Sequence, residues 1–403
     1  MRTQIHPSLE GSAPAREMDR ILRSCVHCGF CTSACPTYRL RGDELDGPRG
    51  RIYLIKEMLA NDAAGRRTQR HLDRCLTCRA CETACPSEVQ YGRLVELGRE
   101  MLEARVPRGP WQRLLRALIA RLLPMPRLMR ALVGSARLVA PVLPERLRRR
   151  VPDRVPLRRR PAAAHARHVV LLEGCVQRAA TPQVNAAAAC LLDQAGVAAL
   201  RVAGEGCCGA LAHHLGRTAE AHDRMRRNVA AWAPLLADGA EAIVSTASGC
   251  GVTLKDYGRQ LSDDGAHAEA AQHVGAGTRD LGEFLLAIGY RPDAALGRGR
   301  RVAWHAPCTL QHGQHAADAP AALLRQAGYE LVPVAEPTIC CGSAGTYSIL
   351  EPRLSRELLA RKVQALTGAG PELIATANIG CHLHLATAAP VPVRHWAELL
   401  CAD

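Results

Sequence analysis

The sequence is short of aromatic residues and of lysine. Aromatic side chains make up 3% of its 403 residues, and lysine occurs only at Lys56, Lys255 and Lys362. The hydrophobic core must therefore be built mostly from Leu, Val, Ile and Ala, and arginine carries almost all of the positive charge. A hydrophobic content of 48% with 22% charged residues is ordinary for a soluble globular chain, and the length predicts two or three domains.

Long apolar runs are also missing. No uninterrupted run reaches the roughly 18 residues of a membrane-spanning helix, and the first turns of the chain contain no apolar segment of the secretory type. We therefore expect a cytoplasmic protein in a reducing compartment. In such a compartment, the 18 cysteines are predicted to ligate metal rather than to form disulfides.

Motifs for nucleotides and nucleophiles are absent as well. The sequence has no G-x-G-x-x-G that follows a predicted strand, no P-loop and no G-x-S-x-G. No flavin or nicotinamide site is evident, so we expect any hydride chemistry to take place on another polypeptide.

What the sequence does have is two crowded cysteine runs. "CVHCGFCTSACP" begins at Cys25 and "CLTCRACETACP" begins at Cys75, and both spell C-x2-C-x2-C-x3-C-P. In this spacing, three thiolates of a run hold one [4Fe–4S] cluster and the fourth holds the other cluster. The predicted ligands of cluster 1 are Cys25, Cys28, Cys31 and Cys85, and those of cluster 2 are Cys75, Cys78, Cys81 and Cys35.

Two zinc sites are the alternative for these runs, but zinc pairs are usually separated by a longer loop. Two adjacent clusters without a substrate pocket indicate electron transfer. Between the runs, "GPRGRIYLIKEML" predicts a helix that begins near residues 49–52 and buries Ile52, Ile55 and Leu59.

The segment 101–168 is strongly basic. It contains 17 arginines against Glu103, Glu145 and Asp153, so its net charge of +14 equals that of the whole chain. "WQRLLRALIARLL" is amphipathic, with Trp111, Leu114 and Leu118 on its apolar stripe. A second helix is predicted after Pro126, and residues 145–161 are expected to be irregular.

Three interpretations of this connector compete. The first is a helical linker with solvated arginines. The second is a helix that docks on an anionic membrane surface or on a partner, and the third is a nucleic-acid-binding segment. Basic charge alone supports the third interpretation, and no nucleic-acid-binding signature accompanies it, so we expect no nucleic-acid partner.

The second half of the sequence contains a duplication. "VVLLEGC" and "RVAWHAPC" predict strands that end in Cys175 and Cys308. Each copy then has a cysteine pair before a glycine, "GCCGA" and "ICCGS", and a glycine–cysteine turn, "SGCG" and "IGCH". Equivalent cysteines lie 133, 133 and 131 residues apart, which indicates two homologous α/β units.

Ligands of open α/β sheets gather at the carboxyl ends of the strands, and these cysteines are expected there. Gly209 and Gly342 are expected to allow close backbone approach, and helices are expected directly after the cysteine pairs. An additional metal or cluster site between the two copies and a set of inactive remnants are both open interpretations. The candidate ligands are Cys175, Cys207, Cys208, Cys250, Cys308, Cys340, Cys341 and Cys381. Cys190 and Cys401 belong to no motif and are expected to be core or surface thiols.

These motifs together resemble a known family. A two-cluster ferredoxin module followed by two "CCG" domains is similar to the iron–sulfur subunits of heterodisulfide reductase, anaerobic glycerol-3-phosphate dehydrogenase and glycolate oxidase. "CVHCGFCTSACPTYRLRGDELDGPRGRIYLIKEML", "HLDRCLTCRACETACPSEVQYGRLVELGRE" and "TASGCGVTLKDYG" look most like the glycolate oxidase type. The sequence departs from the pattern at Thr253 and His384, where a final C-x-x-C thiol would stand.

The resemblance implies a complex in which an FAD-binding subunit, with a second flavin-type subunit, oxidises glycolate to glyoxylate. This chain would carry two [4Fe–4S] clusters and pass electrons to a quinone or another acceptor, with FAD only on the partner. It would be cytoplasmic, with peripheral contact to the inner face of the membrane. The alternatives are a lactate or glycerol-3-phosphate dehydrogenase subunit and an iron–sulfur nucleic-acid-binding regulator.

The predicted fold is mixed α+β: an N-terminal, mostly helical two-[4Fe–4S] ferredoxin-like module followed by two duplicated α/β cysteine-rich domains. The predicted bounds are 1–100 for the ferredoxin-type domain, 101–165 for the Arg-rich connector, 166–295 for the first cysteine-rich domain and 296–403 for the second.

Overall fold

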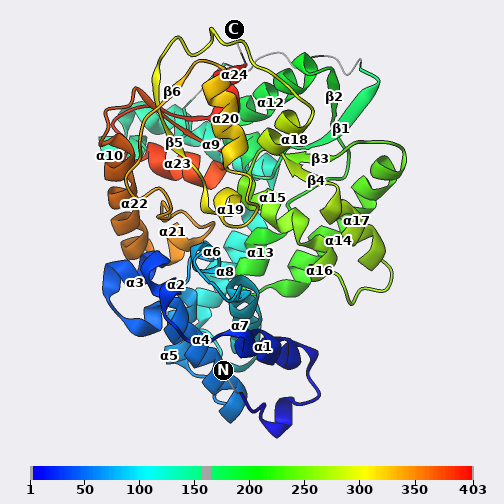
Figure 1. Cartoon of the computed structure of the whole chain (residues 1–403), viewed down its shortest axis with the longest axis vertical. Coiled ribbons are helices and arrows are strands. Elements are labelled where there is room, and N and C mark those ends of the chain that lie inside the picture. Colours follow the sequence, from blue (N-terminus) through cyan, green and yellow to red (C-terminus); the bar gives the residue numbers. More distant parts are fainter. Residues whose placement is uncertain (1–2, 154, 157–160, 162–164, 402–403) are drawn as a thin grey trace. The chain divides into compact units, whose positions relative to one another are not determined.

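The computed structural model describes residues 3–153, 155–156, 161 and 165–401 (Figure 1). The chain divides into two compact units. Unit 1 joins Met1–Arg116 to Thr338–Lys362, and unit 2 joins Ala117–Pro337 to Val363–Asp403. Among the described residues, we find no helix with the length and apolar character that a membrane span requires.

Unit 1 is almost entirely helical. Its N-terminal elements are η1 (Pro7–Leu9), α1 (Ala13–Ser24), α2 (Phe30–Ala34), α3 (Pro36–Arg41), η2 (Glu44–Asp46), α4 (Pro48–Asn61), α5 (Arg66–Asp73), α6 (Ala80–Thr83) and α7 (Tyr91–Arg105). The helix predicted between the cysteine runs is confirmed as α4, which buries Ile52, Ile55 and Leu59. These side chains share one core with Met18 of α1 and Leu94 of α7.

The second segment of unit 1 comes from the second cysteine-rich copy. It contains Cys340, Cys341, α21 (Tyr347–Leu350) and most of α22 (Pro352–Thr367). The cysteine pair of this copy therefore belongs to the same compact unit as the ferredoxin-type cysteine runs.

The basic connector forms α8 (Pro110–Leu122), α9 (Pro126–Val139), η3 (Ala140–Val142) and α10 (Glu145–Arg148). The two predicted helices are confirmed. The prediction of irregular structure is wrong for α10, where Glu145 pairs with Arg149 one turn later at 2.8 Å. Residues 154 and 157–160 of that stretch lie outside the described residues.

The arginines of the connector are not all solvated. In unit 1, Arg108 is buried and forms a bidentate ion pair with Asp73, at 2.7 and 2.9 Å, and Arg116 lies 3.4 Å from the same carboxylate. In unit 2, Arg137 donates to the carbonyl oxygens of Pro152 and Asp153. Several guanidinium groups of the connector are therefore structural, which departs from the solvated arginines of the linker interpretation.

Unit 2 contains two parallel four-stranded sheets. The first has the order β2-β1-β3-β4 and the second the order β6-β5-β7-β8. The strands are β1 (Arg167–Leu172), β2 (Val197–Leu200), β3 (Ile243–Ser245), β4 (Thr278–Asp280), β5 (Arg301–His305), β6 (Glu330–Leu331), β7 (Leu373–Thr376) and β8 (Val393–His395). The identical order confirms the duplication and the mixed fold class. Neither copy's fourth strand was expected from the sequence.

Helices complete the α/β units and cover the sheets. In the first copy they are α11 (Gln177–Ala180), α12 (Pro182–Gln194), α13 (Ala210–His214), α14 (Thr218–Ala237), α15 (Ser248–Lys255), α16 (Tyr257–Gln260), α17 (Ala268–Ala276) and α18 (Leu281–Ala287). In the second copy, unit 2 contains α19 (Cys308–Gln311), α20 (Asp318–Gln326), α23 (Ile379–Ala386) and α24 (Trp396–Leu400). Both sheets have a topological switch point between their two central strands, which is where ligands of open α/β sheets bind.

The two sheets share one hydrophobic core. Val169 of β1, Leu191 of α12, Val302 of β5 and Trp396 of α24 belong to the same buried cluster. Cys190 of α12 and Cys401 are joined by a disulfide, which links the two copies. The expectation that these two cysteines are unpaired core or surface thiols is therefore wrong.

His395 gives unit 2 a predicted dependence on pH. Its buried ring caps α24: Nε2 donates to the Thr246 carbonyl at 2.9 Å and Nδ1 accepts from the Ala397 amide at 3.2 Å. Burial lowers the pKa of His395 from 6.5 to about 3, although the Thr246 carbonyl opposes this shift. The unfolded ring binds a proton below its ordinary pKa while the folded ring stays neutral, so stability is lost as the pH falls from 6.5 towards 3.

We expect His395→Asn, which keeps an acceptor at the helix cap, to flatten this dependence. The stability advantage of the wild type over the variant should shrink by about 1 kcal/mol between about pH 7.5 and about pH 5.5. Urea unfolding of the intact chain at both pH values measures this difference. An advantage that does not change with pH would contradict the role of the His395 ring.

Candidate metal centre

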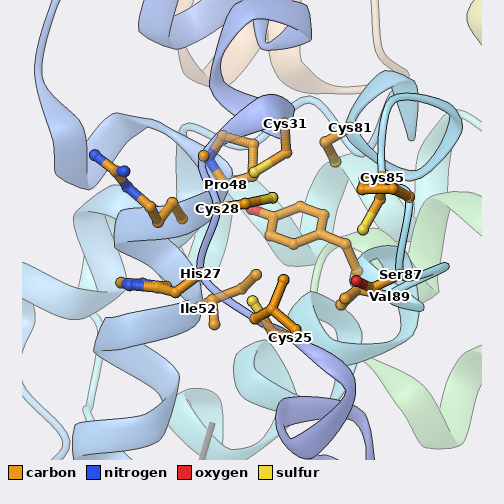
Figure 2. A pocket seen from close by; sticks show the side chains of 15 residues that line it. Cys25, His27, Cys28, Cys31, Pro48, Ile52, Cys81, Cys85, Ser87 and Val89 are labelled. Atoms are coloured by element: carbon orange, nitrogen blue, oxygen red, sulfur yellow. The ribbon is translucent and has the colours of Figure 1, made fainter.

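Five cysteines line one cavity in unit 1: the four predicted ligands of cluster 1, and Cys81. Cys25 follows α1, Cys28 and Cys31 lie on the next turns, and Cys85 comes from the second cysteine run. Figure 2 shows these four side chains, which we call the first thiol set, around the same space. Burial raises the pKa of Cys31 to about 11, and the neighbouring thiols of Cys25, Cys85 and Cys28 contribute to the rise.

A second group joins the remaining motif cysteines. Burial raises the pKa of Cys81, and the nearby charges of Cys78, Cys75 and Cys35 raise it further. We call Cys35, Cys75, Cys78 and Cys81 the second thiol set. Each set thus takes three cysteines from one run and one from the other. This grouping follows the crosswise assignment that the spacing predicts for a two-cluster module, and the assignment stays a prediction because Cys81 also lines the cavity of the first set.

The chemistry of both sets fits a cationic iron–sulfur centre. Four thiolates in a small buried volume repel one another, which raises their pKa values. A bound metal centre offsets this repulsion, because its positive charge stabilises the deprotonated thiolates. Thiolate is also the ligand that [4Fe–4S] clusters use.

The second thiol set lies against donors and cations. The Thr77 amide donates to Cys75 Sγ at 3.4 Å, and the Tyr91 hydroxyl donates to the same sulfur at 3.8 Å. Burial alone would raise the pKa of Cys75, but the charges of Arg51 and Arg99 lower it below its ordinary value. Arg51 also reaches the other run, since its Nη1 lies 4.0 Å from Cys35 Sγ.

A third group of thiols lies at the switch point of the first sheet in unit 2. Cys175 follows β1, Cys207 and Cys208 precede α13, and Cys250 lies in the first turn of α15. Cys207 accepts hydrogen bonds from the thiols of Cys175 and Cys208, which lowers its pKa. Cys208 donates to Cys207 and to Cys250, which raises the pKa of Cys208. We call these four cysteines the third thiol set.

Thr253 stands where the family pattern has a final thiol, and its hydroxyl does not replace that ligand. Its hydroxyl donates to the Gly249 carbonyl of its own helix at 3.1 Å. In the second copy, Cys308 begins α19 and Cys381 lies in α23, where the Asn378 amide donates to its sulfur at 3.5 Å. The same Asn378 side chain accepts from the Gly249 amide at 3.3 Å, so it connects the two copies.

The glycines after the cysteine pairs behave as expected. Gly209 and Gly342 have φ angles of 91° and 85°, in the left-handed region. A Cβ at Gly342 would lie 2.6 Å from the Ser355 carbonyl oxygen. A helix follows directly after Gly209, but in the second copy α21 begins only at Tyr347, so the expectation of a helix directly after both pairs is wrong there.

Sequence reasoning missed Arg51, Tyr91 and Arg99 as neighbours of the second thiol set. A signal for Arg51 was present, because it lies four residues before Ile55 on the stripe that α4 buries. A charged residue on a buried stripe needs a partner, and here the partners come from elements distant in sequence.

The fold and the thiol sets define the class: an iron–sulfur protein with a ferredoxin-type module and two cysteine-rich domains. Comparison with family models agrees. Residues 21–89 match a 4Fe-4S dicluster domain, and residues 169–255 and 302–386 match a cysteine-rich domain.

Among curated proteins, the chain is 45% identical to the glycolate oxidase iron-sulfur subunit of Escherichia coli (strain K12), over 99% of this chain and 98% of that protein. It is 32% identical to the probable glycolate oxidase iron-sulfur subunit of Bacillus subtilis (strain 168), over 90% and 88%. Lactate utilization protein A of Bacillus licheniformis is 27% identical over 49% of this chain and 83% of that protein. The chain therefore belongs to the family of glycolate oxidase iron–sulfur subunits.

Proposed function

We propose that this chain is the electron-transfer subunit of a heteromeric glycolate oxidase. A partner subunit would oxidise glycolate to glyoxylate on FAD, with a second flavin-type subunit, and this chain would accept the electrons and deliver them to a quinone or another acceptor. The clustering of the motif cysteines in unit 1 carries the proposal: Cys85 of the second run lines the cavity of Cys25, Cys28 and Cys31, and the charges of Cys78, Cys75 and Cys35 act on Cys81.

In this proposal the first and second thiol sets each hold one [4Fe–4S] cluster. These clusters supply one-electron chemistry when they are bound, which lets the pair accept the two electrons of a reduced flavin in steps. The surrounding residues exclude water from half of these thiols, since Cys25, Cys35, Cys75 and Cys81 are buried.

The third thiol set is proposed as an additional metal or cluster site. Four thiols from three segments meet the ligand count of a zinc or an iron–sulfur centre. The corresponding cysteines of the second copy are Cys308, Cys340, Cys341 and Cys381.

The test of the proposed function is purification of the complex without oxygen from native lysate. We expect a flavoprotein to co-purify and the complex to reduce a dye with glycolate, with lactate and glycerol 3-phosphate as the competing substrates. Cys78→Ser in the second thiol set should abolish dye reduction. A flavin-free preparation, or full activity in the variant, would overturn the proposal.

We also propose that α8 lies on an anionic lipid surface. Trp111 is 80% exposed, and Leu114, Leu118 and Leu122 on the same helix are 40–49% exposed. Arginine supplies the charge of the surrounding connector, and an exposed apolar stripe beside basic residues suits anionic headgroups.

Co-sedimentation of the intact chain with phosphatidylglycerol vesicles tests this contact. Trp111→Glu combined with Leu118→Glu should weaken binding roughly tenfold or more, because two apolar anchors are lost. Leu286→Glu, which changes a leucine that is 40% exposed on α18, is the matched control. Equal binding by all three proteins would contradict the role of α8.

A further inference from the structure

Arg51 is a fully buried cation between two cysteines of the second thiol set. Its side chain is 1% exposed and is fixed at three points within unit 1. Nε donates to the His71 carbonyl at 2.7 Å, Nη2 donates to Thr37 Oγ1 at 3.1 Å, and Nη1 lies 4.0 Å from Cys35 Sγ. The guanidinium group also lies near Cys75 and Tyr91.

The positive charge of Arg51 is not cancelled by its carboxylate neighbour. Asp46 Oδ1 lies 3.9 Å from Nη2 of Arg51, but Asp46 also pairs with Arg41 and Arg74, each at 2.8 Å. Three guanidinium groups thus share one carboxylate, and Arg51 is the most distant of them. The excess positive charge lies beside the second thiol set.

The first thiol set has a different environment. Its nearby cation is Arg49, whose side chain is 37% exposed and forms an ion pair with Glu44 at 2.6 Å. Solvent screens an exposed charge, and Glu44 neutralises it. Cys28 of this set is exposed, whereas Cys35, Cys75 and Cys81 of the second set are buried.

We propose that Arg51 makes the centre at the second thiol set the better electron acceptor, so that electrons pass from the first set to the second. This inference rests on the proposed function. Reduction adds negative charge, and a fixed cation in a medium of low dielectric constant stabilises the reduced state. The hydrogen bonds from Tyr91 and Thr77 to Cys75 act in the same direction.

The electron balance of this step is simple. The reduced flavin of the partner subunit would supply one electron at a time to a centre held by the first thiol set. That centre would lose one electron as a centre held by the second set gains one, with no proton transferred.

The position of Tyr347 is consistent with this direction. Burial raises the pKa of its hydroxyl, and the charges of Glu351, Cys75 and Cys340 contribute to the rise. The Tyr347 hydroxyl therefore lies near both Cys75 of the second thiol set and Cys340 of the second cysteine-rich copy. Cys340 of the second cysteine-rich copy thus shares the surroundings of Tyr347 with the second thiol set.

Redox titration of the intact chain, followed by EPR, tests the proposal. The wild type should show one one-electron couple for each of the first two thiol sets, and Cys85→Ser, which removes a member of the first set, should retain the more positive of these two. Arg51→Gln should make reduction of that couple at least tenfold less favourable, which corresponds to 59 mV for one electron. Arg51→Lys should keep most of the effect, and Arg49→Gln, the matched control, should change either couple less than threefold.

Several outcomes would overturn the proposal. Two couples of equal potential in the wild type would do so, as would retention of the more negative couple in Cys85→Ser. If Arg51→Gln fails to retain iron, Tyr91→Phe takes its place, and an unchanged positive couple in that variant counts against the proposal. Iron and sulfide analysis separates these outcomes from failure of the proposed function, which predicts two complete clusters in the wild type.

Discussion

Cys85→Ser is expected to remove the cluster of the first cysteine run although Cys85 lies in the second run. The iron content of the chain should then fall by about four atoms, since each cluster contains four. Glycolate-dependent dye reduction by the complex should fall by at least about 100-fold, because loss of a ligand interrupts the transfer of electrons. The physical reason is that Cys85 lines the cavity of Cys25, Cys28 and Cys31.

Double variants make this prediction sharp. Adding Cys28→Ser to Cys85→Ser should cause no further loss of iron, because both residues belong to the first thiol set. Adding Cys78→Ser to Cys85→Ser should remove about four further irons, because it removes the second cluster as well. Cys35→Ser is the mirror control and should remove the other cluster. If Cys85→Ser and Cys78→Ser together cost only one cluster, each run holds its own centre and the crosswise arrangement is wrong.

Asp46→Ala is expected to be the most destabilising substitution in unit 1. Asp46 is completely buried, and its carboxylate contacts Arg41, Arg74 and His71 at 2.8 Å each. Its carbonyl oxygen accepts from Thr37 Oγ1 at 2.7 Å, so the residue joins η2 to α3 and α5. Removal leaves buried cations without their counter-charge, which costs about 3–5 kcal/mol.

The measurement is urea unfolding of the intact chain, followed through the visible absorbance of the clusters, which reports on unit 1. Asp43→Ala is the matched control, because Asp43 lies in the same turn and caps η2 through the Leu45 amide. Loss of that cap should cost only about 1 kcal/mol. Equal denaturation midpoints for the two variants would show that the buried ion pairs of Asp46 do not stabilise unit 1.

The sequence by itself determined the elements whose signals are local. The spacing C-x2-C-x2-C-x3-C-P specifies how a short loop presents its thiols, and the offsets of 133 and 131 residues reveal the duplicated α/β units. The spacing also predicted that Cys85 belongs with Cys25, and the structure places both at one cavity. The predicted domain bounds and the assignment of ligands to clusters stay predictions.

Only the tertiary structure decided what depends on packing between distant segments. It joined Cys190 to Cys401 across 211 residues, and it placed Thr338–Lys362 in the unit of the ferredoxin-type runs. It also brought Arg51 between Cys35 and Cys75, beside a carboxylate shared with other arginines. A sequence pattern records which face of a helix is buried, but the partner that this face meets is set by the packing of the whole unit. For this reason the thiols could be read from the sequence, whereas the charges that surround them could not.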